Sequence, residues 1–134
     1  MKTAVIYWSA TGNTEAMAKA VAEGAGVKAV TVSDFSGDLK EYETLALGCP
    51  AMGDEVLEES EFEPFFSSIE GGLSGKKVLL FGSYGWGDGQ WMRDWEERTK
   101  AAGGELVGGA GYIVNDAPTD DDIEKLKVLG KELD

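Results

Sequence analysis

Short apolar runs alternate along the chain with longer segments in which apolar residues recur every three or four positions. A continuous apolar run is typical of a strand buried on both faces, and the longer spacing is typical of an amphipathic helix. The pattern predicts five strands, at residues 4–7, 27–32, 45–48, 78–81 and, more weakly, 105–114. It predicts a helix of about 12 residues around 17–24. Three further helices are predicted at 62–69, at 88–102 and from 118–119 to 133.

Alternation of strands and helices favours a three-layer α/β/α sandwich around a parallel sheet. Five strands in a chain of 134 residues fit a doubly wound sheet of order 2-1-3-4-5 and a single domain, residues 1–134. Gly108 and Gly109 interrupt the weak fifth strand. Thr119 and Asp122 fit a capping box at the start of the last helix.

Three loops with unusual residues follow the first, third and fourth predicted strands, at 9–14, 49–55 and 82–89. In sheets of this class, ligands bind beyond the carboxyl ends of the strands, where the strand order reverses. Because all three loops leave that edge, their coincidence is a stronger indication of a ligand site than any one loop.

The first loop offers hydroxyl and amide groups, one flexible glycine and a following helix N-terminus. These groups bind a phosphate through neutral hydrogen bonds, and the absence of a P-loop lysine favours a single phosphate monoester over a nucleoside triphosphate. A turn with ordinary helix capping explains the same residues, so both interpretations stay open. The candidate phosphate residues are Ser9, Ala10, Thr11, Gly12, Asn13 and Thr14.

The other two loops offer flat or polarisable side chains. Met52 lies in a polar loop, where a thioether packs well on an aromatic face, and Trp86 lies among glycines, where it can stack on a planar ring. Trp91 and Trp95 suit the core better, because they lie within a predicted helix. A plain turn with an exposed Met and solvated acids remains the alternative for the second loop. The candidate ring-binding residues are Pro50, Ala51, Met52, Gly53, Asp54, Glu55, Ser83, Tyr84, Gly85, Trp86 and Gly87.

A phosphate at one end and a planar heteroaromatic ring between Met52 and Trp86 at the other describe flavin mononucleotide (FMN). Three long segments of the chain resemble short-chain bacterial flavodoxins of the clostridial type. They are YWSATGNTEAMA, LGCPAMGDEVLEESEFEPFF and GKKVLLFGSYGWGDGQWMRDWEERT, and the resemblance covers essentially the whole chain.

The resemblance implies a low-potential one-electron carrier, not an enzyme, that binds FMN non-covalently and shuttles between semiquinone and hydroquinone. It implies that 9–14 hold the phosphate, that Met52 and Trp86 pack on the two ring faces, and that Glu55 bonds ring N3. It also implies that the Gly53–Asp54 peptide flips on one-electron reduction and that Asp116 lies near the ribityl chain.

Composition narrows the remaining possibilities. A formal charge of −13 makes nucleic acid a poor partner and favours either a redox partner with a basic docking surface or a role in solubility alone. A single cysteine, Cys49, and no histidine exclude an internal disulfide and make a zinc site very improbable. No apolar run approaches the roughly 18 residues of a membrane span. The start has no long apolar core or cleavage-like site, so we expect no signal peptide and a cytoplasmic monomer.

Acidic residues crowd the second loop and the segment that follows it, with no basic residue among them, and their field is expected to make a doubly reduced, anionic flavin costly. They are Asp54, Glu55, Glu58, Glu59, Glu61 and Glu63.

Three alternative functions share the predicted fold. An NAD(P)H-dependent reductase of the same fold needs open space over the ring, which Met52 and Trp86 are expected to cover. A receiver domain needs acids that Tyr7-Trp8-Ser9 and Gly48-Cys49-Pro50 do not supply. Flavin-based activation of another enzyme stays open.

Overall fold

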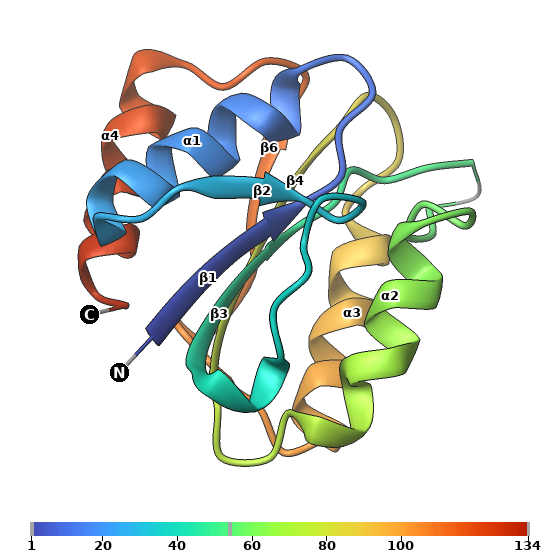
Figure 1. Cartoon of the computed structure of the whole chain (residues 1–134). Coiled ribbons are helices and arrows are strands. Elements are labelled where there is room, and N and C mark those ends of the chain that lie inside the picture. The colour runs from blue at the N-terminus through green and yellow to red at the C-terminus, as the bar shows by residue number, and fades with distance from the viewer. Residues whose placement is uncertain (1, 54, 134) are drawn as a thin grey trace.

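A parallel sheet forms the middle layer of the protein, and helices cover both of its faces (Figure 1). The computed structural model describes residues 2–53 and 55–133. The strands are β1 (Lys2–Tyr7), β2 (Ala29–Thr31), β3 (Tyr42–Gly48), β4 (Lys77–Tyr84), β5 (Glu105–Leu106) and β6 (Tyr112–Asn115). The helices are α1 (Asn13–Ala25), α2 (Phe62–Ile69), α3 (Gln90–Ala101) and α4 (Asp120–Lys131), with short 3₁₀ turns η1 (Leu39–Glu41) and η2 (Glu70–Gly72).

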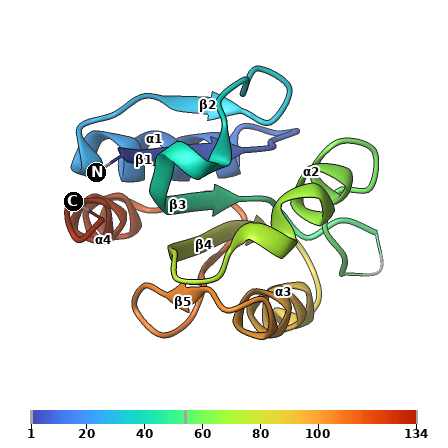
Figure 2. The ribbon, with the colours of Figure 1, turned by 60° about the horizontal axis from the view of Figure 1, so that its bottom comes forward.

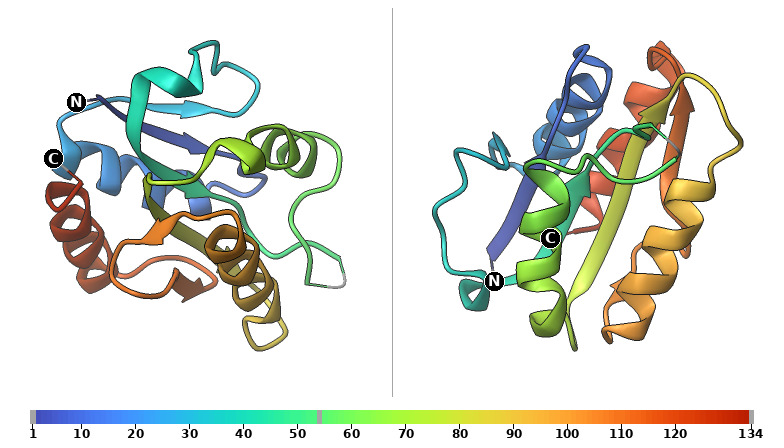
Figure 3. Two further views of the ribbon diagram at one scale, coloured as in Figure 1. Left: turned by 90° about the horizontal axis from the view of Figure 1, so that it is seen from below. Right: turned by 90° about the vertical axis from the view of Figure 1, so that its right-hand side faces the viewer.

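The strand order is β2-β1-β3-β4-β5, with every pairing parallel, so the predicted sandwich and its strand order are confirmed. Helices α1 and α4 cover one face, and α2 and α3 cover the other (Figures 2 and 3). Within residues 2–53 and 55–133, none of these helices has the length and apolar character needed to cross a bilayer.

Side chains alternate between two buried clusters along the central strands. Val5 packs with α1 and α4, whereas its neighbour Ile6 packs with α2 and α3. Leu79 and Leu80 of β4 divide in the same way. This alternation explains the continuous apolar runs, because a central parallel strand is buried on both faces.

The weak fifth strand is two separate strands. β5 pairs with the start of β4 and β6 pairs with its end, so both extend the same edge of the sheet. Gly108 and Gly109 lie between them with φ of 79° and 82°, a left-handed conformation that ends an extended strand. The predicted interruption is confirmed, and the sheet therefore has six strands instead of the five that were predicted.

Two predicted boundaries were wrong near the carboxyl edge. β4 continues through Gly82 to Tyr84, so Ser83 and Tyr84 end a strand and do not lie in a loop. Glycine fits this central strand because a Cβ at position 82 would collide with the Cys49 carbonyl oxygen. α3 begins at Gln90, two residues later than predicted.

Helices α1 and α4 cross closely at two glycines. A Cβ at Gly24 would collide with the backbone carbonyl of Lys127, and one at Gly130 would collide with that of Val21. Backbone cannot move aside as a flexible side chain can, so these glycines set the separation of the two helices. Gly130 is buried at this crossing, and the predicted Thr119–Asp122 capping box at the start of α4 is confirmed.

Gly24→Ala is expected to lower the free energy of unfolding by about 1–3 kcal/mol, because the added methyl overpacks the α1–α4 contact. Denaturant titration followed by circular dichroism measures the change. Gly71→Ala is the matched control, since its Cβ would contact nothing within 4 Å. Equal stability of the two variants would contradict the close-packing argument.

Candidate functional site

The three loops meet at the carboxyl edge of the sheet, in the upper part of Figure 1. They enclose a cavity of about 180 Å³. Its lining confirms that loops far apart in sequence converge here: Ser9, Ala10, Thr11, Asn13, Thr14, Pro50, Ala51, Met52, Ser83, Tyr84, Gly85 and Asp116. Gly12, Gly53, Glu55, Trp86 and Gly87 are not part of this lining, and Asp54 lies outside the described residues.

The first turn of α1 keeps its backbone donors open. Gly12, with φ 97°, precedes the helix and has no side chain that could cap it. Within the described residues no other side chain accepts a hydrogen bond from the first N–H groups of α1. Ser9 Oγ accepts from the Gly12 N–H at 3.1 Å, which shapes the turn. The Thr14 hydroxyl lies 3.1 Å from that of Ser83 and ties the helix start to the end of β4. No Lys or Arg lines the cavity.

The second loop is a tight turn closed by its own backbone. Met52 and Val56 exchange N–H···O hydrogen bonds of 2.9 and 3.0 Å. Gly53 is exposed within this turn at φ 51°, and a Cβ there would contact nothing within 4 Å. Glu55 also has a positive φ, 57°, which is uncommon for a residue with a side chain. The turn is therefore narrow at its base and open to solvent at Gly53.

Glu58 anchors the loop to α2, a role that the sequence analysis missed. Its buried carboxylate accepts from the N–H groups of Ser60, Glu61 and Phe62 at 2.8–2.9 Å, and so caps the start of α2. Burial alone would raise the pKa of Glu58, but the hydrogen bonds from Ser60, Phe62 and Glu61 outweigh it and lower the pKa. A Glu a few residues before an apolar helical pattern is the signal that could have indicated this cap.

Cys49 is enclosed beneath the same loop. Its Sγ accepts from the Glu58 N–H at 3.4 Å, and burial raises its pKa well above the usual thiol value. The thiol therefore stays protonated, which suits a structural role.

The third loop carries an exposed tryptophan, whereas the two tryptophans of the following helix, α3, are buried. Trp86 is 65% exposed, whereas Trp91 and Trp95 are each 1% exposed, so the predicted core role of the latter two is confirmed. The Trp91 indole donates to the Cys49 carbonyl at 3.1 Å and its ring lies 5.6 Å from that of Tyr84. A large exposed aromatic side chain at a ligand edge is available for stacking.

Comparison with known proteins identifies the fold family. Residues 5–127 match the family model described as flavodoxin. The chain belongs to the flavodoxin family. It is 58% identical over 109 residues to a flavodoxin of Clostridium beijerinckii, spanning 77% of this chain and 79% of that protein. It is 47% identical over 133 residues to a flavodoxin of Megasphaera elsdenii, spanning 95% and 94% of the two chains.

A solved structure agrees with these relatives. The solution structure of two-electron reduced Megasphaera elsdenii flavodoxin matches with a TM-score of 0.86 and 40% identity, over 98% of this chain and 99% of that chain. The predicted clostridial-type, short-chain flavodoxin is confirmed. Like its family, this flavodoxin is an FMN-binding electron carrier for redox partners, and not an enzyme.

The donor set of the cavity fits the phosphate end of FMN. Neutral hydroxyls of Ser9, Thr11 and Thr14, the Asn13 amide and the uncapped first turn of α1 are donors suited to one phosphate monoester. The Asp116 carboxylate also lines the cavity, where φ of 61° holds its backbone in the left-handed region.

The acids of the second loop and of the segment after it, up to Glu63, are less uniformly negative in the folded protein than along the sequence. Arg98 of α3, which is distant in sequence, makes ion pairs with Glu63 at 2.7 Å and Glu70 at 3.0 Å. The Arg98 contact lowers the pKa of Glu63. Among the described acids, Glu59 and Glu61 remain exposed on the surface.

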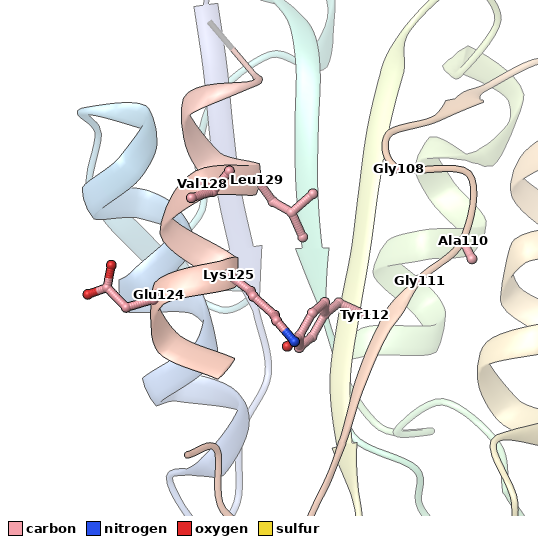
Figure 4. A pocket seen from close by; sticks show the side chains of 8 residues that line it. All are labelled: Gly108, Ala110, Gly111, Tyr112, Glu124, Lys125, Val128 and Leu129. Carbon is pink, nitrogen blue, oxygen red and sulfur yellow. The ribbon is translucent and has the colours of Figure 1, made fainter. Parts of the chain in front are cut away.

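A larger apolar cavity of about 440 Å³ lies away from the three loops, between α4 and the β5–β6 connection (Figure 4). Val128 and Leu129 form its helical wall, and Gly108 to Tyr112 form the other. None of the candidate FMN residues lines it, so this larger cavity is separate from the candidate site at the three loops.

Glu58→Gln is expected to lower the free energy of unfolding at pH 7 by about 1–3 kcal/mol, because the amide leaves an N–H of the α2 turn unpaired. The lowered pKa of Glu58 means that its contribution is present above the unfolded value of about 4.3 and is lost as pH falls through the folded value. The gap between wild type and variant should therefore narrow from pH 7 to pH 3. Denaturant titrations at both pH values measure it, with exposed Glu59→Gln as the control. A gap that stays constant with pH would contradict this role.

Proposed function

We propose that residues 1–134 form one FMN-binding domain that carries single electrons at low potential between redox proteins. The observation that carries the proposal is the cavity where three loops converge on a helix N-terminus that has no side-chain cap and no cation. This combination suits a phosphate that anchors a ligand, whereas a phosphate that is transferred generally meets lysine or a metal ion.

In this proposal the cofactor extends from the cavity to its rim. A volume of about 180 Å³ is small beside pockets of roughly 300–1,000 Å³ that enclose whole ligands, which supports a site for the phosphate and ribityl end only. The ring then packs between Met52, on the rim, and exposed Trp86. Residues 9–14, 50–55 and 83–87 hold the phosphate and the two ring faces, and Asp116 lies along the ribityl chain.

The flavin supplies the redox chemistry when it is bound, and the residues around it set its reduction potentials. Net charge of −13, the exposed carboxylates of Glu59 and Glu61, and a phosphate without a cation all oppose added negative charge at the ring. Arg98 offsets part of this field at Glu63, but it is itself shared with Glu70. The balance favours a low potential for the second electron.

Gly53 suits the peptide change that the flavodoxin resemblance implies. Its φ of 51° is open to glycine without strain, and the space around its Cα admits movement without a collision. A turn whose base is held by the Met52–Val56 hydrogen bonds can change at its tip and leave the rest of the fold unaltered.

The partners in this proposal present basic docking surfaces. Exposed acids beside the ring end would steer such a surface toward the flavin, since complementary charge accelerates encounter. The protein acts as a cytoplasmic monomer in this proposal, and its one cysteine, which is buried, suits a reducing compartment.

Stepwise anaerobic reduction of the FMN-loaded protein is expected to proceed in two resolved one-electron steps. The absorption spectrum at each step and the two midpoint potentials check this. A single two-electron step, or a purified chain unable to take up FMN, would contradict the proposed function.

Glu59→Lys is expected to slow association with a basic flavoprotein reductase by about threefold or more at low salt, and to flatten the dependence of the rate on ionic strength. Stopped-flow electron transfer over a range of salt concentrations measures both effects. Glu43→Lys makes the same charge change at an exposed residue near the opposite edge of the sheet and serves as the control. Equal rates for the two variants would argue against steering by this rim.

A further inference from the structure

One side chain joins the second loop to the third. Glu55 Oε1 accepts hydrogen bonds from the backbone N–H groups of Asp88 and Gly89 at 3.1 Å and of Gln90 at 3.3 Å. These donors lie 33 to 35 positions further along the chain. The contact therefore links the turn that carries Met52 to the loop that carries Trp86.

The contact supplies a cap that α3 lacks locally. Gly89 precedes the helix at φ 94° and has no capping side chain, and the first turn of α3 contains no acid. The first N–H groups of a helix need acceptors, and negative charge is favoured at this end of its dipole. A carboxylate from another loop meets both needs.

One strained residue and one crowded glycine accompany this contact. Glu55 adopts φ 57°, a conformation that strains a residue with a side chain. Gly87 has φ 89°, and a Cβ there would collide with the Glu55 carboxylate. Both features are explained if the Glu55 carboxylate must reach the N-terminus of α3.

We propose that Glu55 is a positioning residue that, through the N-terminus of α3, fixes the spacing between Met52 and Trp86. The inference rests on the proposed function, in which these two side chains face each other across the flavin ring. Oε1 accepts all three backbone hydrogen bonds. Within the described residues Oε2 accepts none, so it is available to a ring N–H. Because Glu55 is held by α3, any movement in the turn between Met52 and Val56 takes place at Gly53.

Two substitutions at the same position separate the loop contact from a contact with the ring. Glu55→Gln keeps one acceptor oxygen for the α3 N–H groups but turns an amide toward the ring. Glu55→Ala removes both contacts. The difference between these variants therefore reports the loop contact, and Glu97→Ala, at an exposed residue of α3, is the control for loss of a charge.

Amide hydrogen exchange of the full chain without FMN gives the first measurement. Exchange at Asp88, Gly89 and Gln90 is expected to be about tenfold faster in Glu55→Ala than in Glu55→Gln, with Glu97→Ala close to wild type. Because no flavin is present, this result depends on the loop contact alone.

FMN affinity and the two midpoint potentials give the second measurement. Glu55→Ala should bind FMN about tenfold more weakly than Glu55→Gln, because an unfixed third loop must be ordered on binding. The separation of the two potentials should also differ between these variants, which simple loss of stability would not produce.

Gly87→Ala tests the same contact with Glu55 intact, since its Cβ displaces the carboxylate. It should reproduce the faster exchange at Asp88 to Gln90, and it carries the test if Glu55→Ala does not fold. Identical exchange and identical FMN affinity in Glu55→Ala and Glu55→Gln would overturn the inference. Wild-type protein that fails to bind FMN would instead overturn the proposed function and leave the exchange result standing.

Discussion

Backbone hydrogen bonding between parallel strands continues past the strands themselves and holds the site together. Trp8 N–H donates to Gly48 at 3.0 Å, Cys49 N–H to Phe81 at 3.1 Å, and Ala51 N–H to Ser83 at 3.0 Å. Each bond joins the loop after one strand to the end of the next. Because α1 and α2 leave for opposite faces of the sheet, the loops before them diverge and leave a crevice at this point.

The helix N-termini around that crevice are treated in different ways. Glu58 caps α2, Glu55 caps α3 and Thr119 caps α4. Of the four helices described, α1 is the one whose first turn meets no side-chain cap. Side chains thus satisfy the termini of α2, α3 and α4, and the open donors of α1 are concentrated where a phosphate is expected. The caps made by Glu55 and Glu58 also turn these two carboxylates toward helix N-termini.

Local pattern was sufficient for most of the fold. The apolar runs located the central strands because those strands are buried on both faces, and α2 began and ended where its pattern predicted. The two boundaries that were wrong near the carboxyl edge both involve glycines, Gly82 and Gly89. A strand residue at position 82 has to be glycine, because the neighbouring Cys49 carbonyl leaves no room for a side chain. A single sequence does not show this reason, so Gly82 looks like the start of a loop. The convergence of the three loops was predictable because parallel strands end at one edge, but the division of their residues between cavity and rim was not.

The sequence by itself determined the fold class and the three loops, since burial periodicity and loop residue types are local properties. The resemblance of three long segments to flavodoxins indicated the family. The tertiary structure alone decided which charges act together. Arg98 meets Glu63 35 positions away, and Glu55 meets the start of α3 at a similar separation. Hydrogen bonds of this kind depend on where the folded sheet brings two loops and two helices, so no local pattern announces them. In this protein they decide which acids near the three loops are paired and which stay exposed.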